Sequence, residues 1–150
     1  MPDSEQAWKN TIDKYNRYID SVSKYFTSSI NELVFDLNFH DAKIKSLIKN
    51  QDNVILSLMI GGRQIKYSRV LIRYSNSNAR IIEAEYVDFT RDDCEVVFDE
   101  LFRHETGSWE HNLLLWPYGE IHIEFGDLSI EVFEALESER LSTENLRIEI

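Results

Sequence analysis

The chain has 150 residues, of which 43% are apolar and 12% aromatic, and its formal net charge at pH 7 is −11. This apolar content can build a core and excludes a disordered chain, while the length fits a single domain over residues 1–150. Cys94 is the single cysteine, which excludes a disulfide framework and a cysteine-based metal site. No stretch approaches the ~20 apolar residues of a membrane span and no signal peptide is visible, so we expect a cytoplasmic protein without membrane contact.

The negative charge is concentrated in the second half of the sequence. Residues 1–78 hold eight Asp and Glu against eleven Lys and Arg, a net of +3, whereas residues 79–139 hold seventeen against three arginines, a net of −14. Such a one-sided field attracts basic partners and repels nucleic acid, so we expect no nucleic-acid binding. The alternative is that the acidic side chains form only a solvated, solubilising face.

A long helix is predicted at the N-terminus, over residues 1–28. Apolar residues from Trp8 to Phe26 recur at spacings of three and four, which forms one stripe at the helical period. Asp3 or Ser4 can cap the start of this helix. We expect the stripe, Trp8 included, to pack against a sheet.

Residues 30–133 show the shorter period of β-strands. Residues 30–37 predict a short strand or an extended entry, and residues 42–48 alternate, with lysines on the solvent face. Further strands are predicted over residues 54–60, 65–74 and 80–89, separated by short turns that include Gly61-Gly62. The short connections predict an antiparallel meander.

Residues 92–103 fit two structures. Val96, Val97, Leu101 and Phe102 can share one face of a helix, whereas the β-branched pair together with Phe98 also suits a strand. The pattern favours a short helix or an irregular segment and leaves the strand open.

The clearest hairpin joins residues 109–116 to residues 120–125 through Pro117-Tyr118-Gly119. Gly119 is free to take a positive φ. The predicted register pairs Leu113 with Ile123, which places the apolar residues and His111 on one face and His122 on the other.

A last strand is predicted over residues 128–132. The charged segment 134–150 predicts a short helix and a loose end, with a terminal edge strand at residues 146–150 as the alternative. The fold class is therefore α+β, with a long N-terminal helix packed on a curved, mostly antiparallel sheet, for which a half-barrel is one possible form.

No set of residues indicates a catalytic or metal site. His40-Asp41 lacks the further ligands of a metal centre, and a hydrogen bond from the His40 side chain to the backbone at a turn is favoured. His111 is expected to be a satisfied core residue, and the carboxylates around Cys94 oppose a reactive thiolate. We therefore expect no enzyme, no cofactor and no metal ion.

Two segments carry a resemblance to known proteins. Residues 38–44 (Asn-Phe-His-Asp-Ala-Lys-Ile) resemble the hydrophobic-His-Asp-x-x-Ile strand entry of small bacterial proteins of unknown function. Residues 107–116 with 119–121 resemble the later Trp…Glu-His-x-Leu-Leu hairpin of those proteins. The resemblance covers residues 30–133, and similar proteins occur beside bacterial toxin genes as immunity proteins. It implies a helix-plus-antiparallel-sheet module and no catalytic residue.

The sequence thus predicts an acidic binding protein, of the immunity-protein kind, that neutralises a basic bacterial toxin domain by direct contact. The alternative is a bacterial accessory module that binds a small ligand in its sheet. The densest run of carboxylates, which we expect to border the partner surface, comprises Asp92, Asp93, Glu95, Asp99, Glu100, Glu105 and Glu110.

Overall fold

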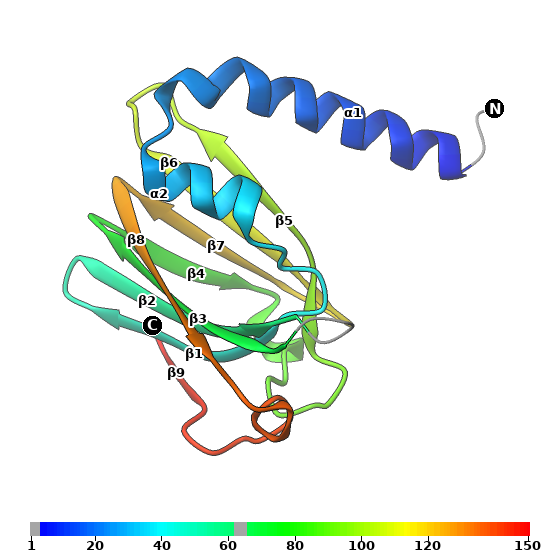
Figure 1. Cartoon of the computed structure of the whole chain (residues 1–150), viewed down its shortest axis with the longest axis vertical. Helices are drawn as coiled ribbons and strands as arrows, with labels where there is room; N and C mark the ends of the chain where they lie inside the picture. The colour runs from blue at the N-terminus through cyan, green and yellow to red at the C-terminus, as the bar shows by residue number, and fades with distance from the viewer. Residues whose placement is uncertain (1–3, 62–65) are drawn as a thin grey trace.

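The computed structural model describes residues 4–61 and 66–150 (Figure 1). One long helix at the N-terminus is followed by two mostly antiparallel sheets, which confirms the predicted α+β class. The helical elements are α1 (Ser4–Val22), η1 (Ser23–Tyr25), α2 (Ser28–Asn31), η2 (Glu32–Asp36), η3 (Ala84–Tyr86) and η4 (Glu137–Glu139). The strands are β1 (Lys43–Asn50), β2 (Asn53–Ile60), β3 (Ser68–Ser75), β4 (Asn78–Ile82), β5 (Glu95–Arg103), β6 (Trp109–Trp116), β7 (Glu120–Phe125), β8 (Asp127–Glu134) and β9 (Arg147–Glu149). Within the described residues, no helix is both long and apolar enough to cross a membrane.

The strands form two sheets, which we call sheet A and sheet B. Sheet A has the order β8-β3-β2-β1-β9 and sheet B the order β4-β7-β6-β5. Neighbours are antiparallel except for β1 and β9, which run parallel. The chain leaves sheet A after β3 and returns through Gly126, whose amide donates to the Ser75 carbonyl at 2.9 Å. The predicted meander therefore holds for β1, β2 and β3, but its fourth strand was misplaced because β4 pairs with β7.

The core lies between the two sheets. Alternate residues of each strand turn inward. The largest fully buried side chains are those of Tyr74 and Phe125, on strands, and Phe39, in the segment before β1. In β6 and β7 the inward set is the predicted one, including Leu113, Ile121 and His111. Alternation therefore identified the buried face of this hairpin correctly.

Helix α1 covers an edge of sheet B, along β5. The Tyr15 and Tyr18 hydroxyls accept hydrogen bonds from the amides of Leu101 (2.9 Å) and Arg103 (2.7 Å). An edge strand exposes such unpaired amides to pairing with other chains, and here the tyrosines occupy them. Figure 1 shows α1 extending along the top of the molecule, outside the two sheets.

Two details of the predicted helix are wrong. The α-helix ends at Val22, before the last residue of the stripe, Phe26. Trp8 is 54% exposed and touches Phe98 edge-on, with ring centroids 5.7 Å apart. A strand edge covers less of the surface of a helix than a sheet face does, so Trp8 stays mostly exposed. The proposed cap Asp3 lies outside the described residues, and Ser4 is the first helical residue.

Residues 30–37, predicted to be a strand or an extended entry, are mostly helical. Thr27 caps α2 by accepting a hydrogen bond from the Ile30 amide at 3.2 Å. Ile30 and Leu33 are buried and three residues apart, which is a helical spacing. The short segment held too few residues to reveal this period.

Other boundaries also differ from the predictions. Residues 92–103, for which a helix or an irregular segment was favoured, contain β5, and a β-bulge between Val96 and Phe98 breaks the alternation that would have revealed the strand. The strand predicted over 80–89 stops at Ile82 because Glu83 adopts a left-handed conformation. The strand predicted to begin at residue 65 is described from Ser68, and Gly62 with Ile65 lies outside the described residues. Segment 134–150 holds the short helix η4 and the edge strand β9.

The β6–β7 register is two residues away from the prediction. Leu113 pairs with Ile121 instead of Ile123, and the Leu115 amide donates to the Gly119 carbonyl at 2.9 Å. Gly119 therefore belongs to the ladder, although it has the expected positive φ of 98°. A Cβ at this position would come within 2.3 Å of a Val87 methyl group, so only glycine fits.

Candidate protein interface

The seven carboxylates predicted to border a partner surface do not form one patch. Asp92 and Asp93 lie in the turn before β5, and Glu105 lies in the turn after it. A strand of nine residues places these two turns more than about 25 Å apart. The remaining four, Glu95, Asp99, Glu100 and Glu110, lie on β5 and β6.

Three of the seven accept hydrogen bonds from arginine or histidine side chains of the chain itself. Asp93 forms a two-pronged ion pair with Arg91, with both N–O distances at 2.8 Å. Glu95 accepts from Arg140 at 2.8 Å, and this arginine also donates to the Asp41 carbonyl. Asp99 accepts from the Nε2 of His111 at 2.9 Å. These carboxylates are already compensated, so they offer less to a partner than their number suggests.

Glu100 and Glu110 lie on the outer face of sheet B. The register places Glu100 beside Asn112 and Glu110 opposite Glu124. Burial raises the pKa of Glu100, and the charges of Glu120 and Asp99 raise it further. The negative groups of this face are therefore close enough to repel one another, which favours a cationic partner.

Two glutamates of the outer face, Glu120 and Glu124, were not among the predicted partner residues. The strands of sheet B, all described, carry six carboxylates against two arginines, a net of −4. Of those two, Arg103 faces inward and stacks on Trp109 at 4.7 Å, which leaves Arg80 on the outside. The alternation of β7 in the sequence was enough to place Glu120 and Glu124 on the outer face, because both are at outward positions of the strand.

Large apolar side chains are exposed at one end of this acidic face. Trp116 is 56% exposed and Leu114 43% exposed, and both point outward from β6. Tyr118 and Tyr86, also exposed, pack against each other with ring centroids 6.2 Å apart. Exposed aromatic residues beside charged side chains are typical of protein-binding surfaces. The sequence indicated only a hairpin position for Trp116 and Tyr118, not a place on a binding surface.

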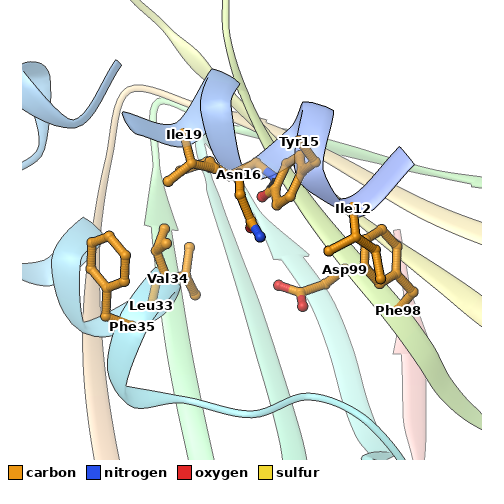
Figure 2. Close-up of a pocket in the computed structure, with 10 residues that line it drawn as sticks. Ile12, Tyr15, Asn16, Ile19, Leu33, Val34, Phe35, Phe98 and Asp99 are labelled. Carbon is orange, nitrogen blue, oxygen red and sulfur yellow. Dashed lines mark hydrogen bonds between the residues drawn. The ribbon is translucent and has the colours of Figure 1, made fainter. Parts of the chain in front are cut away.

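A groove separate from the outer face of sheet B lies between α1, η2 and β5. Its volume is about 270 Å³, and Asn16 from α1 and Asp99 from β5 point into it among apolar side chains (Figure 2). Behind Asp99, His111 also hydrogen-bonds the Tyr74 hydroxyl at 2.7 Å through Nδ1. Burial raises the pKa of Tyr74 well above 10, so the hydroxyl stays protonated and donates to His111.

The Tyr74–His111–Asp99 chain has the order of groups found in catalytic relays but carries no nucleophile at its open end. Tyr74 and His111 are fully buried, and the group that reaches the groove is a carboxylate. The groove is smaller than the ~300–1,000 Å³ of typical ligand pockets. Its arrangement suits a structural role, in which the buried histidine fixes β3, β5 and β6 together.

The other residues singled out in the sequence have structural roles. The His40 side chain hydrogen-bonds the Val97 carbonyl at 2.8 Å, as predicted for this turn. Cys94 is buried, and burial raises the pKa of its thiol. Lys43 was expected on the solvent face but is 4% exposed, because its ammonium group donates to the carbonyls of Arg91 (2.7 Å) and Cys94 (2.9 Å). Burial lowers the pKa of this lysine.

Comparison of the chain with protein-family models, with curated proteins and with solved structures finds no match.

Proposed function

We propose that this chain is a non-enzymatic binding protein that recognises a basic protein domain through the outer face of sheet B. More specifically, we propose that the chain is an immunity protein that neutralises a bacterial toxin domain. The observation that carries it is the combination, on one sheet face, of exposed aromatic residues with glutamates that no lysine or arginine of the described residues pairs. The aromatic residues supply contact area, and the carboxylates attract and orient a cationic partner.

The two parts of the surface predict two separable kinetic effects. Trp116 and Leu114 are exposed apolar contacts, so their loss should raise the dissociation rate. Glu100 and Glu120 act at a distance through their charge, so reversing them should lower the association rate. Toxin domains that act on nucleic acid need basic grooves, and an acidic surface can occupy such a groove.

The test uses stopped-flow association of the full chain with the basic toxin domain encoded beside it. We expect Trp116→Ala to weaken binding by about 2 kcal/mol or more, mainly through faster dissociation. Glu100→Lys combined with Glu120→Lys should slow association, and the difference from wild type should shrink as salt rises. The matched control is Asp92→Lys combined with Asp93→Lys, which makes the same charge change in the distant turn before β5. If the control variant slowed association as much as the sheet B variant, the interface would not lie on the outer face of sheet B. Association that is flat with salt would contradict steering by charge.

A further inference from the structure

His104, Glu110 and Glu124 meet on the outer face of sheet B, beside the β5–β6 turn. One ligand-capable atom from each lies within 4.8 Å of the others. Glu110 and Glu124 are direct partners in the β6–β7 register, and the His104 Nε2 lies 4.0 Å from the Glu110 Oε1. The turn fixes His104, because its amide donates to the Ser108 carbonyl and its carbonyl accepts from the Gly107 amide, both at 2.9 Å.

Two features of this cluster indicate a cationic ligand. The His104 Nε2 is shielded from solvent and has no hydrogen-bond partner among the described residues. Two glutamates directly opposite each other repel, and the nearby arginine, Arg80, contacts His122 instead (3.4 Å). A shielded ring nitrogen without a partner, beside two facing carboxylates, is a set of donors that a metal ion would satisfy.

Glu110 is also held in a ligand-like orientation. Its side chain is 14% exposed, and the Asn112 amide group donates to its Oε2 at 3.0 Å. The other oxygen, Oε1, is the one that faces His104. Hydrogen bonds of this kind to a ligating carboxylate orient it and tune its affinity for metal.

We propose that His104, Glu110 and Glu124 bind a divalent transition-metal ion, represented by Zn²⁺. Imidazole and carboxylate are zinc ligands, whereas Mg²⁺ and Ca²⁺ prefer all-oxygen sites. Tetrahedral zinc with bonds of about 2.1 Å spaces its ligands by about 3.4 Å, so the three atoms must approach by about 1 Å. Glutamate side chains can make this movement. The site goes beyond the proposed function, does not depend on it, and departs from the sequence-based expectation that the chain holds no metal.

The same face offers a matched control. His122 and Glu120 form a second histidine–glutamate pair, with Nε2 and Oε2 3.5 Å apart. In the described part of the chain, no third histidine, cysteine or carboxylate joins this pair to complete a cluster. The His122 Nε2 is also shielded and without a hydrogen-bond partner among the described residues, so His122 controls for a histidine of the same kind that lacks the second carboxylate.

The test is zinc titration of the full chain, purified without a histidine tag, in competition with a chromophoric chelator. We expect one equivalent of Zn²⁺ to bind, and His104→Gln and Glu124→Gln each to weaken binding about tenfold or more. His122→Gln should bind as wild type does. Zinc should raise the melting temperature of the wild type and of His122→Gln, but not of His104→Gln.

The stability of the variants in the absence of zinc shows whether a loss of zinc affinity comes from unfolding. Glu124 is exposed and faces a like charge, so Glu124→Gln should be at least as stable as the wild type without zinc. Its loss of zinc affinity then cannot arise from unfolding. Wild-type binding no tighter than that of His104→Gln, or an equal loss in His122→Gln, would show that zinc binds the surface non-specifically and would overturn the proposal.

Discussion

Replacing Tyr74 with phenylalanine tests whether the buried Tyr74–His111–Asp99 chain stabilises the fold. The hydroxyl and the imidazole are both fully buried, and they are joined by a hydrogen bond of 2.7 Å. Tyr74→Phe leaves the His111 Nδ1 without a donor in a region that water does not reach. A buried polar group left unpaired costs about 1–3 kcal/mol, so we expect about 2 kcal/mol of destabilisation. With a urea m-value of about 2 kcal/mol/M, the unfolding midpoint should fall by about 1 M.

The assay is urea unfolding followed by circular dichroism, with Tyr86→Phe as the matched control. Tyr86 is 64% exposed, so losing its hydroxyl should change stability by less than about 0.5 kcal/mol. A double variant, Tyr74→Phe with His111→Leu, should lose less than the sum of the two single losses, because it removes both partners of one bond. Additive losses, or a Tyr74→Phe midpoint equal to that of the control, would show that this bond does not stabilise the core.

Two further predictions follow from the position of α1 and from the buried tyrosines. Trp8→Ala should cost about 1 kcal/mol or less in urea unfolding, in contrast to the ~3–5 kcal/mol expected of a buried tryptophan, because Trp8 is mostly exposed. A loss above about 3 kcal/mol would mean that α1 packs more closely than described. Burial raises the pKa of Tyr15 to about 12 and that of Tyr74 well above 10. The folded state then holds these protons more tightly than the unfolded chain, whose tyrosines titrate near pH 10, so this stability is present below about pH 10 and is lost as the pH rises toward about 12. Unfolding free energies that stay constant over this range would contradict the burial of both hydroxyls.

Strong local patterns made much of the fold predictable. Alternating residues located β1, β2, β6, β7 and β8, and the inward face of the β6–β7 hairpin was correct. The helical stripe located α1 but not the surface it packs on. That surface, the β5 edge, depends on hydrogen bonds that the Tyr15 and Tyr18 hydroxyls accept from amides 85 or more residues away, which no local period encodes.

The register of one hairpin decided whether the glutamate pair could be found. The predicted register, in which Leu113 faces Ile123, leaves Glu110 without an acidic neighbour across the strands. The observed shift of two residues brings Glu124 opposite Glu110. In the observed hairpin the Leu115 amide donates to the Gly119 carbonyl, so the turn closes one residue earlier than predicted. Gly119 there lies so close to Val87 that no side chain fits, a contact between segments whose proximity the sequence did not reveal.

The candidate interface was predictable in charge but not in position. The excess of carboxylates between residues 79 and 139 pointed to an acidic surface. Which acids stay available depends on their partners in three dimensions. Arg140 is 45 residues away from Glu95, and His111 is buried on the strand next to Asp99. The sequence therefore shows only where carboxylates are dense, whereas the structure shows which of them are paired with other groups of the chain.

The connection between the sheets explains how a charge bias along the sequence becomes a bias on the surface. Sheet B is built from consecutive segments, so the six carboxylates on its strands lie on adjoining strands, while the other acids of residues 79–125 lie in the connecting segments. The chain then returns to sheet A, where β8 pairs with β3. Glu131 lies opposite Leu71 there, on the face that also carries Arg69 and Arg73. The carboxylates of β8 thus join the basic strands of sheet A, whose five strands have a net charge of +2 against −4 for sheet B. We therefore expect a basic partner to prefer sheet B, which is the sheet whose outer face also exposes Trp116.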